Sequence, residues 1–306
     1  MNSRDLLLGI AVMCVWGFNF AVIKLGVDHV DPLILTGLRF TLASIPAVFF
    51  VRRPPVSWRL LIAYGLVFGV GVWGMVTYSI SAGLSAGMAS LLLQLSVAIS
   101  LLIGWLFLGE RITKSRAMGA TLALIGLSLS LLIEDGSVTS TGLLLVIIGA
   151  TCWALTGLIM KAAKTDQVFA FIVWGMLFAP LPLFTLSLIS NGSSGFIQLV
   201  DTFDGAALFS ILFQAYPTTL LGYWIWNRLI VKYPLSSVAP LTLLVPIFGL
   251  LGSALFYQEV IGVTKMLASL LVITGLLVGV VKAEHLTWFK KRQKLVSTSP
   301  LQSGCK

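Results

Sequence analysis

Amide and aromatic side chains inside the long apolar stretches of this sequence are candidates for binding a polar molecule. Asn19 follows Trp16 by three residues, so a helix would hold both side chains on nearly the same face. Gln94 is the lone amide of its apolar stretch. An amide both donates and accepts hydrogen bonds, and an indole adds one donor and a flat ring face. This chemistry suits the reversible binding of a polar molecule.

Further aromatic side chains in these stretches are candidates for the same cavity. They are Tyr78, Trp153, Tyr223 and Trp226, which offer hydroxyl, indole and stacking contacts. A cavity with many rings and few charges suits a zwitterion, because backbone dipoles and helix ends can hold its charges. Two other interpretations stay open. Buried rings also serve as packing or interface anchors, and amides such as Asn19 and Gln94 also form hydrogen bonds between helices.

Arg39 is the one basic residue well inside an apolar stretch. A charge at such a place is usually paired or functional. Its side chain either extends outward to pair with Asp28 or Asp31, or contacts a carboxylate of a substrate. Glu110 and Glu259 each end an apolar stretch. They are candidate proton carriers, with a structural role as the favoured interpretation.

The groups that a membrane-embedded enzyme needs are missing from the sequence. His29 and His285 both lie outside the apolar stretches, no H-E-x-x-H motif is present, and no apolar stretch carries paired aspartates. A G-x-x-x-x-G-K-[ST] nucleotide loop is missing as well. We therefore expect no catalytic residue, no metal and no cofactor. Residues 69–74 spell G-x-G-x-x-G, but inside an apolar stretch these glycines favour close helix contact instead.

Prolines interrupt two of the apolar stretches. Pro240 and Pro246 lie in one of them, and Pro180 and Pro182 lie in the other. A proline removes a backbone donor and can kink its helix. The stretch with Pro240 and Pro246 is therefore a candidate bending element.

The elements that position these side chains are membrane-spanning helices. Hydrophobic residues make up 58% of the 306 residues, charged residues make up only 10%, and the mean hydropathy is +1.01. An ordinary soluble domain carries about 25% charged residues. The net charge of +9 comes from short Lys and Arg clusters between apolar runs, a pattern of membrane orientation that argues against nucleic-acid binding. The expected partners are the lipid bilayer and a small-molecule substrate.

Ten stretches are long and apolar enough to span a membrane, which takes about 20 residues each. They cover residues 6–24, 33–51, 60–81, 84–108, 116–133, 142–160, 168–190, 206–227, 235–257 and 265–281. With the amino terminus in the cytoplasm, most of the 20 Lys and Arg residues fall in inner segments. We therefore predict an all-α, multi-pass protein of the bacterial inner membrane, with ten transmembrane helices and both termini cytoplasmic.

The chain also repeats itself. Glu110 and Glu259 are each followed by an apolar helix of similar sequence. We predict two repeats of five helices, residues 1–136 and 137–284, and a basic cytoplasmic tail, residues 285–306. Because five is odd, the second repeat enters the membrane from the opposite side. Inverted repeats are typical of secondary transporters, which bind substrate near the membrane midplane between the repeats.

Several motifs occur along the chain in a recognisable order. They are residues 15–20 (VWGFNF), 37–40 (GLRF), 91–94 (LLLQ), 109–111 (GER), 222–226 (GYWIW) and 238–246 (VAPLTLLVP). In these motifs and their spacing the sequence resembles the EamA-type members of the drug/metabolite transporter superfamily, over roughly residues 5–282. Among them it is most similar to the bacterial exporters of O-acetylserine and cysteine.

The resemblance implies a ten-helix, two-repeat inner-membrane exporter of small amino acids or related metabolites, working by alternating access. In this family the positions of Trp16 and Asn19 border the central cavity, so the resemblance implies that both contact cargo. The alternative is a broad-specificity drug or metabolite efflux carrier. A passive facilitator and a membrane-embedded enzyme are less favoured.

Overall fold

The computed structural model describes residues 1–109, 112–133, 135–233 and 235–279. Within these ranges the chain forms helices joined by turns and short loops, and no strand. The all-α prediction is therefore confirmed for the described part of the chain. Glu110 and the predicted basic tail, residues 285–306, lie outside the described residues.

The helices of the first half follow the order of the predicted apolar stretches. They are α1 (Ser3–Val27), α2 (Pro32–Val48), α3 (Trp58–Tyr64), η1 (Gly65–Gly74), α4 (Met75–Ser81), α5 (Ala86–Leu92), α6 (Leu95–Leu108) and α7 (Lys114–Ser130). The three elements α3, η1 and α4 run on from one another as one composite helix, Trp58–Ser81.

The second half begins with the long helix α8. Its helices are α8 (Ser140–Ala163), α9 (Val168–Met176), α10 (Pro180–Asn191), α11 (Ser194–Thr202), α12 (Gly205–Phe213), η2 (Gln214–Leu221), α13 (Gly222–Lys232), α14 (Leu235–Val238), η3 (Ala239–Leu243), α15 (Leu244–Tyr257) and an unlabelled last helix, Val263–Gly279. Here α12, η2 and α13 form the second composite helix.

Several of the described helices suit a lipid environment by their length and composition. Six of them could cross a membrane, and a seventh span is possible if the pair Ser194–Thr202 and Gly205–Lys232, bent by 109°, counts as one. Pro32–Val48 and Val263–Gly279 are shorter apolar helices. Large apolar side chains such as Phe50, 88% exposed, cover the outside of the bundle, as lipid contact allows. The chain is a helical multi-pass membrane protein, while the count of ten spans stays a prediction.

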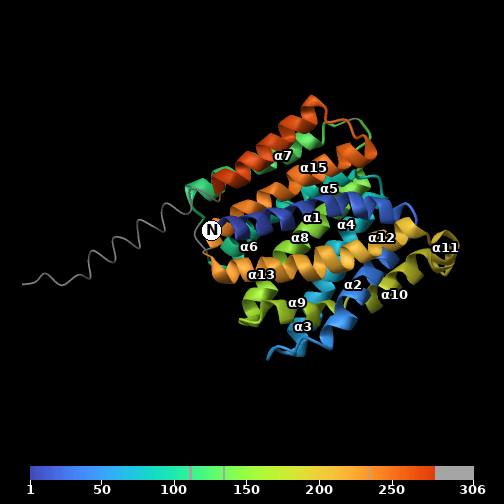
Figure 1. The fold of residues 1–306 in the computed structure, drawn as a ribbon. Helices are drawn as coiled ribbons and strands as arrows, with labels where there is room; N and C mark the ends of the chain where they lie inside the picture. Colours follow the sequence, from blue (N-terminus) through green and yellow to red (C-terminus); the bar gives the residue numbers. More distant parts are fainter. Residues whose placement is uncertain (110–111, 134, 234, 280–306) are drawn as a thin grey trace, which may run out of the picture.

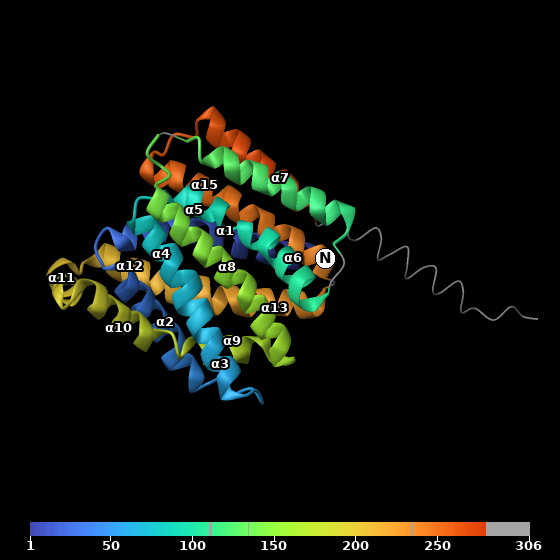
Figure 2. The same ribbon diagram turned by 180° about the vertical axis from the view of Figure 1, so that it is seen from behind.

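The helix α1 lies in the middle of the bundle, beside α5, α12, α13 and α15 (Figures 1 and 2). Gly17 allows α15 to approach closely, because a side-chain carbon at this position would collide with Phe248 and with the Val245 carbonyl group. Since α1 belongs to the first half of the chain and α15 to the second, the contact between the halves runs through the centre of the molecule.

At the edge of the bundle, α7 and the last helix lie side by side, away from the other helices (Figures 1 and 2). A side-chain carbon at Gly119 would collide with the Gly275 carbonyl oxygen, and the Ser115 hydroxyl donates to the Val278 carbonyl oxygen over 2.7 Å. These are the two helices of similar sequence that follow Glu110 and Glu259. The predicted equivalents thus pack directly against each other through small residues.

The two ends of the bundle differ in charge. At one end, α1 begins beside the finish of α13, and Lys232 Nζ lies 2.6 Å from Asp5 Oδ2. Arg228 lines a pocket at this place, which we call the basic end. At the finish of α1 lie Asp28 and Asp31, and Asp31 caps α2. We call this the acidic end.

Irregular turns occupy matching places in the two halves. The π-helix η1 lies in the third helical stretch of the first half, and the π-helix η2 lies in the third helical stretch of the second half. A π-helix is rare, and its wider turn often marks a functional site. The prediction that residues 69–74 lie inside a helix is confirmed, although their π geometry is not visible in the sequence.

The prolines interrupt their helices at particular turns. Pro240 lies in the 3₁₀ segment η3, which separates α14 from α15. Pro246 lies in the first turn of α15, directly after η3, where a missing N–H costs little. Its part in the interruption stays a prediction. Pro180 and Pro182 lie in the first turn of α10, after the break that ends α9.

Candidate functional site

Aromatic rings from both halves of the chain meet in the centre of the bundle. The ring of Trp16 lies 5.2 Å from that of Tyr223 and 5.7 Å from that of Trp226, centroid to centroid. The ring of Phe68 lies 5.9 Å from Tyr223 and 6.1 Å from Trp153. Four of the five predicted aromatic residues therefore belong to one continuous set of rings.

We call this set the aromatic cluster. Its members are Trp16, Tyr64, Phe68, Trp73, Trp153, Phe171, Tyr223 and Trp226. They are supplied by α1, by the α3–η1 helix, by α8 and α9, and by α13. The packing interpretation also has support, since Tyr64, Phe68 and Trp73 are almost fully buried against one another. Trp16, Trp153 and Trp226 are only half-buried and so have ring surface left for a ligand.

Asn19 lies fully buried beside this cluster. Its side-chain Oδ1 accepts a hydrogen bond from the Thr218 hydroxyl over 3.0 Å, and Trp16 Nε1 donates to the Thr218 carbonyl oxygen over 2.9 Å. The interhelical role considered for Asn19 is therefore present, between α1 and η2. The Asn19 Nδ2 group has no hydrogen-bond partner among the described residues, so one half of this amide is free to bind.

Arg39 lies in the interior of the bundle with no exposed surface. Its Nε donates to the Thr219 hydroxyl over 3.1 Å, and its Cζ lies 4.2 Å from the centroid of the Trp73 ring. Both Nη groups lack a hydrogen-bond partner among the described residues. Arg39 thus joins the aromatic cluster to η2.

The predicted pairing of Arg39 with Asp28 or Asp31 is wrong, and so is the predicted extension toward the outer end. Asp28 instead pairs with Lys24. Asp31 accepts hydrogen bonds from the Leu33 and Ile34 N–H groups, as the cap of α2, and from Ser187 and Asn191. The reason is geometric: Arg39 lies almost two turns inside α2, on the face that packs against η1 and η2.

Two predicted site residues do not join the aromatic cluster through any contact of the described residues. Tyr78 is 36% exposed and lines a polar pocket of about 410 Å³ at the acidic end, with Asp31 and Asn191. Gln94 is half-buried at the turn between α5 and α6. Its apolar neighbours in the sequence fit either interpretation, so its role stays a prediction.

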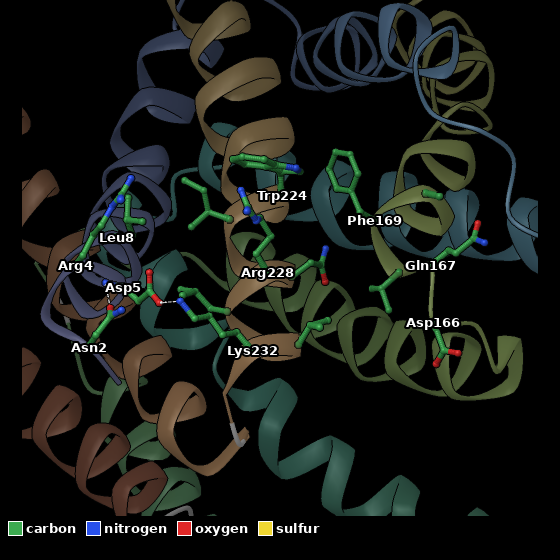
Figure 3. A pocket seen from close by; sticks show the side chains of 16 residues that line it. Asn2, Arg4, Asp5, Leu8, Asp166, Gln167, Phe169, Trp224, Arg228 and Lys232 are labelled. Carbon is green, nitrogen blue, oxygen red and sulfur yellow. Dashed lines mark hydrogen bonds and ion pairs between the residues drawn. The ribbon is translucent and has the colours of Figure 1, made fainter.

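A larger pocket, of about 760 Å³, opens at the basic end between the start of α1, the start of α9 and the face of α13 (Figure 3). Arg228 Cζ lies 4.6 Å from the centroid of the Trp224 ring. Asp166 lies across the pocket on the α8–α9 connection, and Asn227 Nδ2 is buried without a partner in the described chain. The helix α13 therefore carries some of the side chains that line the pocket, such as Trp224 and Arg228, and also the cluster residue Tyr223.

Sequence reasoning missed the pocket around Arg228 and four members of the aromatic cluster, which are Tyr64, Phe68, Trp73 and Phe171. Trp73 lies inside the G-x-G-x-x-G run, and only the glycines of that run were interpreted, as residues that favour close helix contact. Arg228 was counted only for the orientation of the chain in the membrane. The signal that could have found Trp73 is its spacing of four residues from Thr77, since both side chains then share a helix face with polar groups.

Glu259 is fixed by contacts at the acidic end. It accepts hydrogen bonds from Ser85, over 2.6 Å, and from Ser253. Lys265 Nζ, whose side chain is 1% exposed, lies 2.7 Å from Glu259 Oε1 and 3.0 Å from Asp135 Oδ2. These contacts agree with a structural role for Glu259. Burial raises the pKa of Asp135, but hydrogen bonds from Ser137 and the Lys265 ammonium outweigh it and hold that pKa below its ordinary value.

The part of the chain that the structure describes contains no set of side chains that could bind a metal ion. No group of three or more His, Cys, Asp or Glu side chains is placed to hold an ion there. The arrangement offers ring faces, amides and a guanidinium group, which can bind and release a ligand but supply no activated nucleophile.

Comparisons with known proteins agree with this chemistry. Residues 4–132 and residues 140–281 each match the EamA-like transporter family. The chain is 36% identical to the "Probable amino-acid metabolite efflux pump" of Escherichia coli strain K12, over 92% of this chain and 96% of that protein. It is 35% identical to the protein of the same name from Salmonella typhimurium, with the same coverage.

A solved crystal structure shares the fold at a TM-score of 0.62 and 18% sequence identity, over 94% of this chain and 99% of the other. An identity this low supports the fold alone. The family matches extend over both halves, as the sequence motifs predicted. The chain belongs to the EamA-like transporter family and is a multi-pass membrane transporter, not an enzyme.

Proposed function

We propose that this protein exports small amino acids or closely related metabolites across the bacterial inner membrane, and that it binds them at the aromatic cluster. The observation that carries the proposal is the composition of that cluster, which combines ring faces with buried, unpartnered polar groups from both halves of the chain. The names of the two bacterial relatives, at 36% and 35% identity, support the amino-acid metabolite class.

The half-buried rings would cover the apolar side of a small metabolite. Trp16, Trp153 and Trp226 present flat faces, and ring stacking contributes about 0.5–1.5 kcal/mol per contact beyond area burial. Asn19 Nδ2 supplies a hydrogen-bond donor at the edge of this surface. A free polar group in a membrane interior is costly, so an amide left open is best explained by a cargo that it binds.

The pocket at the basic end would be the cytoplasmic entrance. Lys and Arg residues concentrate on the cytoplasmic side of membrane proteins, and Arg228 and Lys232 line this pocket. Asp166 adds the opposite charge, so that both ends of a zwitterion find a counter-charge on arrival. The side chains of α13 then lead from Trp224 in this pocket to Tyr223 in the aromatic cluster.

Alternating access requires helices that bend near the cargo. Both π-helices adjoin the cluster, since η1 contributes Trp73 and η2 bonds to Trp16 and Asn19. The 3₁₀ segment around Pro240 lies in the helix that ends in α15, the neighbour of α1. Irregular turns lack part of the regular hydrogen-bond ladder and therefore bend more easily. We infer that the two halves rock about these segments.

The test is efflux of labelled cysteine, O-acetylserine, threonine and aromatic amino acids from loaded cells that contain wild-type or Asn19→Ala protein. We expect one class of these compounds to leave faster with the wild type and about tenfold more slowly with Asn19→Ala, because a hydrogen bond to a charged cargo is worth about 1.5–3 kcal/mol. Phe49→Ala is the matched control, since Phe49 is 81% exposed on the outer surface.

Efflux of every amino acid at the background rate, with normal amounts of protein in the membrane, would contradict the proposal. A dye or drug panel that leaves rapidly from the same cells would then favour the broad-specificity alternative.

A further inference from the structure

Arg39 carries a positive charge in the interior without a counter-charge. Its guanidinium group is ionised at any physiological pH, has no exposed surface, and is bonded to a neutral partner, the Thr219 hydroxyl. None of the ion pairs of the described chain includes it. An uncompensated charge in a low-dielectric interior costs several kcal/mol, so this arrangement calls for an anion.

The acidic residues that could supply the counter-charge are engaged elsewhere. Asp28 pairs with Lys24, and Glu259 pairs with Lys265. Asp31 accepts four hydrogen bonds at the start of α2. Among the described residues no carboxylate pairs with Arg39, so a bound anion is the partner that its charge calls for.

Hydrogen-bond donors without partners gather around the guanidinium group. The Trp73 ring lies against the Arg39 guanidinium group, and Thr77, four residues further along the same helix, has a hydroxyl without a partner among the described residues. Asn19 is linked to Arg39 through two adjacent residues of η2, because Thr218 donates to Asn19 Oδ1 and Thr219 accepts from Arg39 Nε. The Asn19 Nδ2 group has no partner among the described residues.

The free acceptors are fewer. Among the buried polar side-chain atoms without a partner in the described chain, Gln214 Oε1 is the acceptor of this region. The two Nη groups of Arg39, the Asn19 Nδ2 group and the Thr77 hydroxyl are donors without a partner in the described chain. An excess of donors around a positive charge is the signature of an anion site.

We propose that Arg39 binds the carboxylate group of the cargo, with both Nη groups donating to its two oxygens. The proposal rests on the proposed function and assigns one end of the exported molecule. A carboxylate matches the parallel Nη donors of a guanidinium group in shape and charge. The Trp73 ring holds the plane of the guanidinium group from below, and Thr219 fixes its Nε, so Arg39 is oriented before cargo arrives.

The test compares an amino acid with its uncharged carboxamide. Purified protein in lipid vesicles transports the labelled amino acid, and each unlabelled compound is added as a competitor. For the wild type we expect the amide to compete at least tenfold more weakly, since loss of a charged hydrogen bond costs about 1.5–3 kcal/mol. In Arg39→Gln this preference should fall to about twofold or less. A purely structural arginine would weaken both competitors equally.

Arg53→Gln is the matched control, because Arg53 also lies over an indole ring, 4.0 Å from Trp58, but lies near a loop and bonds to the Val56 carbonyl oxygen. It should keep the wild-type preference. If Arg39→Gln does not accumulate, Thr219→Val gives a second measurement. This variant keeps the charge and removes only its anchor, so it should reduce the preference without abolishing it.

The outcomes separate the two proposals. A wild-type protein that transports the amino acid but binds its amide equally well overturns the carboxylate assignment and leaves the proposed function standing. A wild-type protein that transports no amino acid overturns the proposed function. Loss of wild-type binding when chloride is replaced by gluconate would show that Arg39 holds an inorganic anion, which also overturns the assignment.

Discussion

The Arg39 side chain lies in the interior of the bundle, against the Trp73 ring, and donates a hydrogen bond to Thr219 from the second half of the chain. Its position inside an apolar stretch marked it as exceptional, and the structure places it in the interior, beside the aromatic cluster. The partner was not predictable, because the choice between Asp31, eight residues away, and Thr219, 180 residues away, depends on which face of α2 meets which helix. In a soluble protein the apolar stripe of a helix shows which face is buried, but in a membrane protein both the lipid and the interior are apolar, so this signal is weak.

Half of the aromatic members of the candidate site were predictable from residue type, and their grouping was not. Trp16, Trp153, Tyr223 and Trp226 stand out as rings among aliphatic residues, and all four lie in the cluster. Tyr78 has the same sequence context but lies at the acidic end. Tyr78 lies near the end of the composite helix Trp58–Ser81 and therefore far along the helix axis from the aromatic cluster. This position could not be read from the sequence, because the ends of a membrane span are uncertain by several residues.

Lys265 provides a prediction for stability at the level of a single side chain. Lys265→Met should lower the free energy of unfolding by about 3 kcal/mol, because it leaves the largely buried Glu259 carboxylate without its counter-charge. Thermal unfolding of the protein in detergent measures the change. Lys232→Met is the control: its pair with Asp5 is largely exposed on the lysine side, so the loss there should be much smaller. Equal losses in both variants would contradict the special role of Lys265.

Asp135 should give this network a dependence on pH. Its pKa is lowered in the folded protein, so its contribution to stability is present above the ordinary aspartate pKa, about 4, and is lost as pH falls through the folded value. The melting temperatures of wild type and Asp135→Asn should therefore differ at pH 6 and converge below about pH 4. A difference that persists undiminished at pH 3 would show that the carboxylate charge is not involved.

At the scale of whole elements, the order and extent of the helices followed from the sequence well, while their irregular turns did not. Each predicted stretch overlaps a helix or a composite helix of the described chain. The π-helices η1 and η2 and the 3₁₀ segment η3 were not predicted as such, since their hydrogen bonding depends on neighbouring helices and not on local residue preference.

The contact between α7 and the last helix can be tested with matched glycines. Gly119→Ala should lower the melting temperature, because the added carbon meets the Gly275 carbonyl oxygen of the facing backbone, which cannot move without separating the helices. Gly157→Ala is the control, since no atom of the described chain lies within 4 Å of an added carbon there. It should be neutral or slightly stabilising, by up to about 1 kcal/mol. The opposite order of the two melting temperatures would contradict the packing described.

Pro240 offers a test of the bending segment. Pro240→Ala restores a backbone donor in the 3₁₀ turn and should favour a continuous helix, so transport should slow several-fold while cargo competes as strongly as before. Pro246→Ala, in the first turn of α15, should stay close to the wild type. The measurements are the transport rate in vesicles and the concentration of unlabelled cargo that halves it. A wild-type transport rate in Pro240→Ala would show that this segment is not needed for alternating access.

At the scale of the whole molecule, the two family matches divide the chain into two halves. The family match occurs twice, at residues 4–132 and 140–281, and the π-helices lie at equivalent places. The two halves meet around α1 and share the aromatic cluster (Figures 1 and 2). A molecule built in this way can offer its central site to one side and then to the other through a small rotation of one half. The inverted orientation of the repeats and the cytoplasmic termini are predictions that this account needs.

The central claim is that the protein is an alternating-access carrier of amino-acid metabolites, and counterflow tests it most directly. Vesicles with purified protein are preloaded with an unlabelled amino acid, diluted, and given a trace of the same labelled compound outside. A carrier exchanges one for the other, so the label should accumulate transiently above its outside concentration and reach a rate that saturates with substrate. A label that only equilibrates, at a rate proportional to concentration, would contradict the account and identify a passive pore.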